Sequence, residues 1–304
     1  MEGSNQSAIR EFIFMGVTNE PNIEVFLFTF FSLIYIVTVF GNIAIIFLVL
    51  ITLRSPMYFF LGNLSLSDLC YSTVVTPKML NDILSERKSI TFIGCALQLY
   101  FFALFASTEC YILSTMGYDR YVAICHPLQY VVIMNKTKCI LLMSAVYGGG
   151  LLTAGIHTSS TLTLSFCGPN VINHFYCDIP PLMELSCSDT YINKTIISSV
   201  VFVLGFVSVI VTVASYVYIF FTIIKIQSSE GRHKACSTCT SHLLCVSLFY
   251  GTVFFMYLRP ASGYSVTQDK VVSVFYTMII PMLNPIIYSF RNTEVKEAIK
   301  RLCS

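Results

Sequence analysis

Charged residues are scarce in this chain. Asp, Glu, Lys and Arg make up 11% of its 304 residues, whereas about 25% is usual for a soluble domain. Hydrophobic residues account for 55% of the chain, and the mean hydropathy is +0.74. This balance excludes an ordinary soluble domain, and we expect no nucleic-acid partner.

Motifs of the common enzyme classes are also missing. No His-Glu-x-x-His, P-loop or Gly-x-Ser-x-Gly string occurs. The stretches between the apolar runs are short, and the longest, from about Gly168 to Lys194, has fewer than thirty residues. We therefore expect no enzyme and no organic cofactor, and we expect the function to lie in the apolar runs and their connections.

Seven long apolar runs take up most of the chain. A helix needs about 20 mostly uncharged residues to cross a bilayer, and within these runs only Asp68 and Glu109 carry a carboxylate. The sequence predicts an all-α membrane protein, a seven-transmembrane helix bundle over residues 25–290. The runs are Val25–Leu53, Tyr58–Pro77, Ile90–Tyr118, Cys139–Phe166, Thr195–Ile224, Leu243–Leu258 and Val271–Phe290.

The distribution of basic residues predicts the orientation. With the N-terminus outside, the inner segments hold 11 Lys and Arg and four acidic residues. The outer segments then hold seven Lys and Arg and ten acidic residues. Cationic loops resist translocation, so an outer N-terminus and an inner C-terminus are favoured. Residues 1–24 then form an extracellular tail, in which Asn5 begins a glycosylation sequon.

Residues 291–304 form the predicted cytoplasmic tail. Val295, Ile299 and Leu302 recur there at helical spacing, opposite a basic face that includes Lys296 and Lys300. This pattern predicts a short amphipathic helix after the seventh span that lies on membrane lipid.

Four of the 12 cysteines lie on the predicted outer face, where disulfides form. They are Cys95, Cys167, Cys177 and Cys187, and four cysteines allow three pairings, among which the sequence does not choose. A bond from Cys95 to Cys177 would tie the second outer loop over the mouth of the bundle. Cys167 and Cys187 would then be the candidate second pair.

A polar layer is predicted at mid-depth in the membrane. At 1.5 Å per residue, Asp68 lies roughly 16 Å above Met57, and Glu109 lies roughly 15 Å above Asp119. Two bare carboxylates at one level are costly, so at least one is protonated or the pair shares a cation. An uncharged hydrogen-bonded network and a bound Na⁺ both satisfy this requirement.

Several ordered strings on these runs carry a resemblance to a known family. Residues 116–128 read MGYDRYVAICHPL, with an Asp-Arg-Tyr segment at the inner end of the third run. The other strings are GN (41–42), SPMYFFL (55–61), LSLSD (64–68), CDIPPL (177–182), LSCSDT (185–190), KACSTCTSHL (234–243) and PMLNPIIYSFRN (281–292). Together they resemble the olfactory receptors among the rhodopsin-like G-protein-coupled receptors, over essentially the whole chain.

This resemblance implies an activation switch. Asp119 would hold Arg120 while the receptor is silent, and an outward movement of the sixth helix would free Arg120 to face the G protein. The chain has no Trp, and Tyr250 stands where other rhodopsin-like receptors have a toggle Trp. The alternative is that Asp119 and Arg120 form only an ion pair at the membrane interface, with the Arg side chain extended toward water, and have no switch role. The implied switch residues are Asp119, Arg120, Tyr121, Tyr216, Tyr250, Asn284, Pro285 and Tyr288.

Helix register within the family implies a ligand pocket in the outer half of the bundle. Its wall is mostly apolar and has no acid above Glu109, which favours a small, neutral, largely hydrophobic and volatile ligand over a cationic amine. Each side chain could instead pack between helices or face lipid. The implied residues are Phe102, Ala103, Ala106, Ser107, Leu204, Val253, Phe254, Tyr257, Val274 and Thr277.

The expected function is odorant reception at the plasma membrane, by resemblance in cilia of olfactory neurons, through a stimulatory, olfactory-type G protein that raises cAMP. One alternative is a rhodopsin-like receptor for a metabolite outside the nose, which would use the same chemistry. A small-solute transporter is the competitor from another class. Against it, the seven runs show no inverted repeat and no matched pair of broken helices.

Overall fold

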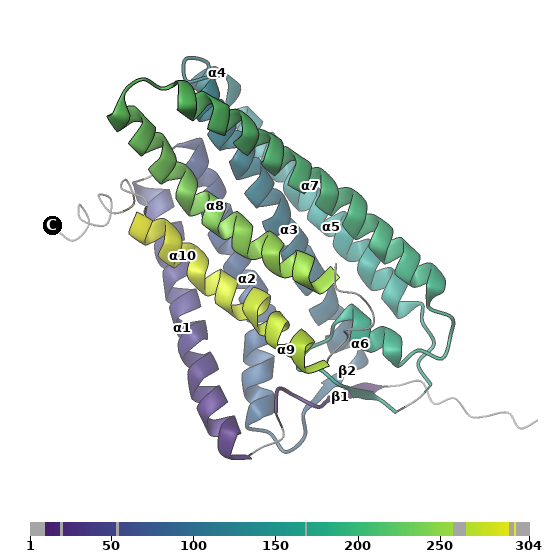
Figure 1. The fold of residues 1–304 in the computed structure, drawn as a ribbon. Coiled ribbons are helices and arrows are strands. Elements are labelled where there is room, and N and C mark those ends of the chain that lie inside the picture. Colours follow the sequence, from purple (N-terminus) through teal and green to yellow (C-terminus); the bar gives the residue numbers. More distant parts are fainter. Residues whose placement is uncertain are drawn as a thin grey trace, which may run out of the picture.

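Long helices make up most of the structure, a computed structural model that describes residues 10–18, 21–52, 55–167, 169–257, 266–291 and 295. They lie side by side along one direction (Figure 1). The long elements are α1 (Pro21–Ile51), α2 (Pro56–Ile83), α3 (Phe92–Cys125), α5 (Lys136–Leu162), α7 (Tyr191–Lys225), α8 (Ser229–Tyr257), and the continuous rod of α9 (Val266–Val274), η2 (Phe275–Ile279) and α10 (Ile280–Arg291). Two short helices, α4 (Tyr130–Ile133) and α6 (Ile179–Glu184), lie in the connections.

Five of these helical segments are long and apolar enough to cross a membrane. They are Ile23–Ile51, Phe92–Cys125, Lys136–Leu162, Tyr191–Lys225 and Thr267–Ser289. Helix α2 carries Asp68, Lys78 and Asp82, and α8 begins at Ser229 in a polar stretch, before the predicted start at Leu243, so both are less apolar. The prediction of a multi-pass helical membrane protein is confirmed in this coarser form.

Hydrophobic side chains cover much of the outside of the bundle. Helix α7 exposes Phe202, Phe206 and Phe220, for example, whereas its buried positions include Ser208 and Thr212. Apolar groups outside and hydrogen-bonded polar groups inside are the arrangement that a lipid surround favours.

Helix α3 is the central element and contacts α2, α5, α7 and α8. It ends at Cys125, beyond the predicted end at Tyr118, so Asp119 and Arg120 lie within the helix. The two side chains form an ion pair. His126 caps the helix directly before Pro127, since a proline restricts the residue that precedes it.

A close approach between α1 and α10 explains the Gly41-Asn42 string. A Cβ atom at Gly41 would lie 3.0 Å from Cγ of Pro285, so a larger residue would push the helices apart. The Asn42 amide donates to the carbonyl of Pro281 at 3.0 Å and to that of Thr38 at 2.9 Å.

One end of the bundle carries a three-stranded sheet, and we call it the sheet end. Strand β1 (Glu11–Phe14) lies between β2 (Ser89–Thr91), to which it is antiparallel, and β3 (Val171–Ile172), to which it is parallel. Phe12 and Phe14 of β1 are buried beneath it. Residues 10–18 of the predicted tail are therefore folded onto the bundle, while Asn5 lies outside the described residues.

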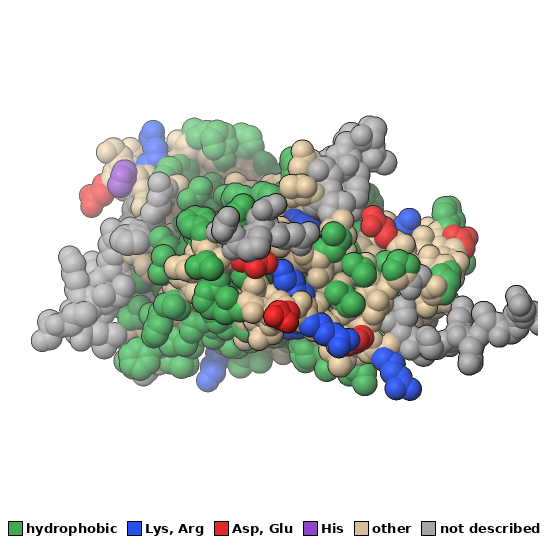
Figure 2. Space-filling view, turned by 90° about the horizontal axis from the view of Figure 1, so that it is seen from below, with side chains coloured by type: hydrophobic (Ala, Val, Ile, Leu, Met, Phe, Trp, Pro, Cys, Tyr) green, Lys and Arg blue, Asp and Glu red, His purple; other side chains and the backbone are tan. Residues whose placement is uncertain are grey.

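Two disulfides fasten the loop that crosses the sheet end. Cys95 at the start of α3 is bonded to Cys177, with the Cα atoms 5.5 Å apart, and Cys167 is bonded to Cys187. Seen from this end, acidic and basic side chains are interspersed among hydrophobic ones (Figure 2). The opposite end carries Arg120 and α4, and we call it the Arg120 end.

Candidate functional site

A buried polar layer lies midway along the bundle. The Asn284 amide uses both hydrogens there, donating to Oδ2 of Asp68 at 3.0 Å and to Oε1 of Glu109 at 3.4 Å. All three residues are at most 2% exposed. The two carboxyl groups thus lie at one level, as the helix arithmetic predicts.

This layer has more acceptors than donors. Among the described residues, Oδ1 of Asp68, Oε2 of Glu109 and the amide oxygens of Asn42 and Asn284 have no hydrogen-bond partner. Carboxylate and amide oxygens are ligands for hard cations. The residues present therefore fit a cation, and they fit equally a proton shared between the two acids.

An aromatic cluster lies between this layer and the sheet end. The Phe102 ring packs against Tyr71 of α2 at 5.3 Å, Tyr176 of the disulfide-bonded loop at 5.0 Å and Tyr276 of η2 at 6.1 Å between ring centroids. Val274 packs in the same cluster. Two predicted ligand-binding residues are thus brought together under the loop.

A chain of hydrogen bonds, which we call the roof, joins the loop to the last helical rod. Tyr176 donates to Oδ2 of Asp178 at 2.8 Å and shares a short hydrogen bond with Tyr276. Ser273 then bonds the Tyr276 hydroxyl at 3.0 Å and Nε2 of His174 at 3.3 Å. Tyr276 lies in the π-helical turn η2, a local irregularity of the kind that often occurs at functional sites.

The other predicted ligand-binding residues are more dispersed. Thr277 is fully buried and donates to the Ser273 carbonyl at 2.6 Å, while Ala103 packs toward Ala154 of α5. The side chains of Ala106, Ser107, Leu204 and Val253 are half-buried, whereas those of Phe254 and Tyr257 are not among the side chains that the structure describes.

Tyr250 links three helices below this region. Its hydroxyl bonds Ser208 of α7 at 2.7 Å and lies 3.6 Å from the Cys110 sulfur of α3. Ser208 also donates to the Cys110 carbonyl at 3.0 Å. The residue predicted from the missing Trp therefore connects α8 to α3 and α7.

A second link between these helices lies nearer the Arg120 end. The Tyr216 hydroxyl bonds Nδ1 of His242 at 2.6 Å, and Nε2 of His242 bonds the Leu113 carbonyl at 3.0 Å. The resemblance implied Tyr216 as a switch residue, whereas His242, which stands in the string of residues 234–243, was not among the implied switch residues. Tyr288 is fully buried in the same core as Tyr250.

At the Arg120 end, Asp119 holds two groups. One carboxylate oxygen pairs with Arg120 at 3.1 Å, and the other accepts from the Tyr130 hydroxyl of α4 at 2.9 Å. Tyr121 instead bonds Nε2 of His126 at 3.1 Å. Burial, followed by the Asp119 carboxylate, raises the pKa of Tyr130, so its hydroxyl stays a donor at neutral pH.

Through the activation switch and the G protein that the resemblance implies, we predict that Tyr130→Phe raises cAMP in the absence of ligand. A hydrogen bond to a charged group contributes about 1.5–3 kcal/mol, so if it is made only in the silent state its loss shifts the equilibrium by roughly 10- to 100-fold. Tyr218→Phe is the matched control, because Tyr218 lies at the same end and is 60% exposed. Equal ligand-free cAMP in both variants, at equal surface expression, would contradict the prediction.

Because the roof contains the buried His174, we predict that the stability of the folded protein depends on pH. His174 is 2% exposed, and burial, followed by the Lys270 charge, lowers its pKa from 6.5 to about 3. The unfolded state then binds this proton more readily, so stability is full above about pH 6.5 and falls as the pH drops toward 3. We expect a loss of about 2 kcal/mol between pH 7.5 and 5 in unfolding of the purified protein.

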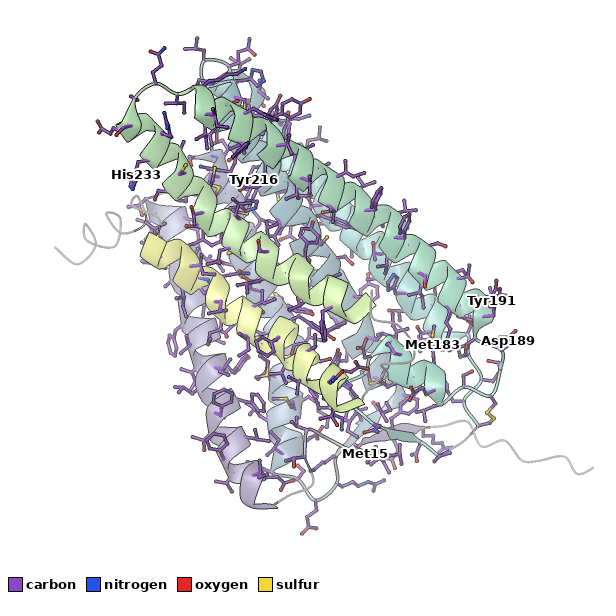
Figure 3. The ribbon with its side chains drawn as sticks, viewed as in Figure 1. Met15, Met183, Asp189, Tyr191, Tyr216 and His233 are labelled. Carbon is purple, nitrogen blue, oxygen red and sulfur yellow. A yellow bond between two sulfur atoms is a disulfide. The ribbon has the colours of Figure 1, made fainter. Side chains whose placement is uncertain are left out.

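His174→Gln should reduce this pH dependence, because an amide can bond Ser273 without titrating. His233→Gln is the control, since His233 lies exposed near the start of α8 (Figure 3). If the wild type and both variants lose equal stability at pH 5, His174 does not carry the effect.

A bundle of apolar helices with a buried polar layer at mid-depth and an Asp-Arg-Tyr segment at one end defines the G-protein-coupled receptor class. A sequence model described as olfactory receptor matches residues 31–304. Olfactory receptor 5AR1 of Mus musculus is 52% identical over 304 residues, which cover 99% of this chain and 98% of the relative. Olfactory receptor 5F1 of Homo sapiens is 49% identical over 306 residues, which cover 100% of this chain and 98% of the relative.

The chain belongs to the olfactory receptor family. Members of this family are signalling receptors and not enzymes. Family membership supports odorant ligands and G-protein coupling in general, and it confirms the resemblance found in the sequence.

Proposed function

We propose that this receptor spans the membrane seven times with its N-terminus outside and binds small, neutral, largely hydrophobic odorants. Binding raises cAMP through a stimulatory, olfactory-type G protein at the plasma membrane of olfactory cilia. Helices α2 and α8 supply the two spans beyond the five apolar ones, since both pack within the same bundle. Their polar residues can face inward, away from lipid.

The observation that carries the proposal is the attachment of α8 to α3 and α7 at two levels. Tyr250 makes one link and His242 the other, and Asp119 holds Arg120 beyond them. A ligand that favours the state with these links broken releases α8 and Arg120 together. It can do so only by its differential affinity for the two states.

The ligand pocket is proposed below the roof, around the turns of α3 that carry Phe102 and Ser107. No described carboxylate lies between the Asp68–Glu109 layer and Phe102, so a neutral ligand meets no unpaired charge there. Ser107, Tyr257 and Thr277 are the polar groups proposed to orient it.

A panel of odorants tested with a cAMP readout, in cells that carry the olfactory G protein, tests the function. Once an active odorant is found, Ser107→Ala, Phe254→Ala and Tyr257→Phe should shift its potency. Phe206→Ala is the control, because Phe206 is 52% exposed on α7. Unchanged potency in all three variants would place the pocket elsewhere, and solute flux through the purified protein would favour a transporter.

We further propose that Na⁺ binds the polar layer through Asp68 and Glu109. Sodium at ten times its Kd should then stabilise the purified receptor by about 1.4 kcal/mol, so the thermal unfolding temperature should be higher in sodium than in potassium. Asp68→Asn should remove this difference, and Asp189→Asn, an exposed position at the sheet end, should keep it. Equal unfolding temperatures in the two salts would favour the proton-sharing network.

A further inference from the structure

A small apolar surface at the Arg120 end is left uncovered, where α4 lies at the end of the bundle (Figure 1). It is formed by Leu128, Val131 and Val132, which are 97%, 79% and 74% exposed. Turn-forming backbone hydrogen bonds run from Gln129 to Met134, so residues three and four apart share one face of this segment. We call these three aliphatic residues the α4 patch.

The other side of α4 is packed against the bundle. Tyr130 and Ile133 pack against the largest part of the core, and Met134, the next residue, is 2% exposed within it. The Tyr130 hydroxyl also donates to Asp119 of α3 at 2.9 Å. These contacts fix α4 with the α4 patch directed away from the bundle.

Two lysines follow the α4 patch at the start of α5. Lys136 is exposed and Lys138 is half-buried, and neither forms an ion pair within the part of the chain that the structure describes. The first turn of α5 has no acidic residue, although cations are unfavourable at the positive end of a helix dipole. Asn135 already caps this helix by accepting from the Lys138 N–H at 2.9 Å. The charge left unbalanced is therefore that of the two lysine side chains.

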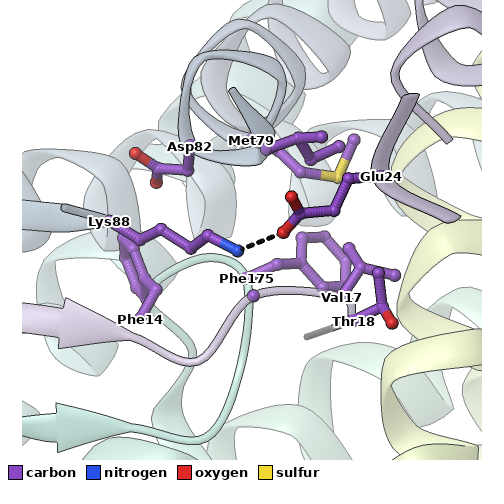
Figure 4. Close-up of a pocket in the computed structure, with 10 residues that line it drawn as sticks. Phe14, Val17, Thr18, Glu24, Met79, Asp82, Lys88 and Phe175 are labelled. Atoms are coloured by element: carbon purple, nitrogen blue, oxygen red, sulfur yellow. Dashed lines mark hydrogen bonds and ion pairs between the residues drawn. The ribbon is translucent and has the colours of Figure 1, made fainter. Parts of the chain in front are cut away.

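Two lysines near the sheet end have acidic partners within the protein. Nζ of Lys88 bonds Oε1 of Glu24 at 2.8 Å (Figure 4), and Lys78 pairs with Asp82. The lysines that follow the α4 patch differ from these in having no such neighbour. A partner that carries negative charge would complement them.

The α4 patch and these lysines adjoin the lipid-facing surface of α5. Val132 and Lys136 are four residues apart, so their Cα atoms are at most about 14 Å apart. One turn beyond Lys136, Ile140 is 49% exposed and Leu141 is 61% exposed, on a helix apolar enough to cross a membrane. Lys136 therefore begins a stripe that faces lipid, where a lysine extends its ammonium group toward the lipid headgroups.

We propose that the α4 patch docks on anionic phospholipid of the inner leaflet. The three aliphatic side chains enter the boundary between headgroups and acyl chains, and Lys136 and Lys138 pair with the headgroups. Apolar side chains on one side with lysines beside them are typical of segments that lie in this boundary. Anionic lipids are concentrated in the cytoplasmic leaflet. The choice of leaflet rests on the proposed orientation of the receptor, whereas the preference for anionic lipid does not.

Other partners fit this surface less well. A stable protein interface takes about 20–30 residues from each side, and the α4 patch has three. A neutral lipid would cover the aliphatic side chains but leave the two lysines without a counter-charge. Anionic lipid satisfies both, because its acyl chains and its headgroup lie at adjacent depths.

Fluorescence quenching tests the contact in the full-length receptor, in nanodiscs of equal parts phosphatidylcholine and phosphatidylserine. A fluorescent acetylnaphthyl amino acid replaces Val131, and its quenching by nitroxide-labelled lipid is compared with its quenching by water-soluble acrylamide. The same amino acid in place of Val203, 56% exposed on α7, gives the lipid-facing reference. In place of Glu230, exposed at the start of α8, it gives the water-facing reference. We expect the Val131 probe to behave as the Val203 probe does.

Lysine variants test the preference for anionic lipid. Nitroxide-labelled phosphatidylserine should quench the Val131 probe at a lower fraction of the lipid than nitroxide-labelled phosphatidylcholine. The double variant Lys136→Gln with Lys138→Gln should reduce this preference by about fivefold for each lysine. Lys194→Gln is the matched control, since it removes an exposed cation at the sheet end and should leave the preference unchanged. Loss of one lysine alone leaves the apolar contact in place.

A second double variant, Leu128→Ser with Val132→Ser, removes the apolar contact. Both side chains are exposed, so thermal unfolding should match that of the wild type while the Val131 probe becomes accessible to acrylamide. Acrylamide quenching of the Val131 probe in the wild-type background equal to that of the Glu230 probe would overturn the proposal and leave the α4 patch for a protein partner. Equal quenching by the two labelled lipids would overturn it as well. The assay requires neither odorant nor G protein, so its failure leaves the proposed odorant signalling untouched.

Discussion

Arg120→Ala is expected to reduce ligand-evoked cAMP to the level of cells without the receptor, at equal surface expression. Arg120 is held by Asp119 at 3.1 Å, and its side chain is 12% exposed, so the guanidinium lies mostly within the Arg120 end. Among the described residues its Nε has no hydrogen-bond partner. A released Arg120 can offer a planar set of donors to the G protein that Ala cannot replace.

Two further variants separate the switch from a general effect of charge. Arg120→Lys keeps the cation but loses the planar fork, so it should give an intermediate response. Lys136→Ala removes an exposed cation at the start of α5 and should leave signalling intact. Full ligand-evoked cAMP in Arg120→Ala would mean that the Asp119–Arg120 pair is only an interfacial ion pair.

The helices were largely predictable because the bilayer imposes a length and an apolar composition on each span. Where the prediction failed, polar residues were part of a helix. Helix α8 begins at Ser229 and not at Leu243, since hydropathy marks only the part of a helix that faces lipid. Helix α3 likewise continues beyond Tyr118 to Cys125, because paired charges need not end a helix.

The sheet could not be predicted in the same way. Strand β1 has four residues, and its partners lie far along the chain, with Glu11 opposite Thr91 and Ile13 opposite Val171. The alternation of buried and half-buried residues in β1 is too short to distinguish a strand from a loop. The edges with which β1 pairs come from two separate connections, the one between α2 and α3 that carries β2 and the disulfide-bonded loop that carries β3.

The depth of the candidate-site residues along the bundle could be predicted from the sequence, but their contacts with one another could not. Helix rise alone placed Asp68 and Glu109 at one level, and the structure joins them through Asn284. By contrast, the bonds of Tyr130 to Asp119 and of His242 to Tyr216 depend on how separate helices are rotated against each other. A hydropathy pattern does not contain that rotation when polar residues occur on several faces.

Loss of the Cys95–Cys177 disulfide is expected to reduce the amount of folded receptor at the cell surface strongly. The bond closes a chain separation of 82 residues, for which the entropy of the unfolded chain gives roughly 4.5 kcal/mol. It also holds the loop that carries His174 and Tyr176 over Phe102. A double variant, Cys95→Ser with Cys177→Ser, should therefore lose surface expression and any remaining response to ligand.

The second disulfide provides a graded comparison. Cys167 and Cys187 are 20 residues apart, which corresponds to about 3 kcal/mol, so their double Ser variant should be less impaired. Cys70→Ser, at a free cysteine of α2, controls for the substitution itself. In surface staining and in thermal unfolding, we expect the wild type to have the highest value, the Cys167/Cys187 double variant a lower one and the Cys95/Cys177 double variant the lowest. An equal loss in the two double variants would mean that the loop folds as one unit, since chain entropy alone requires the longer closure to matter more.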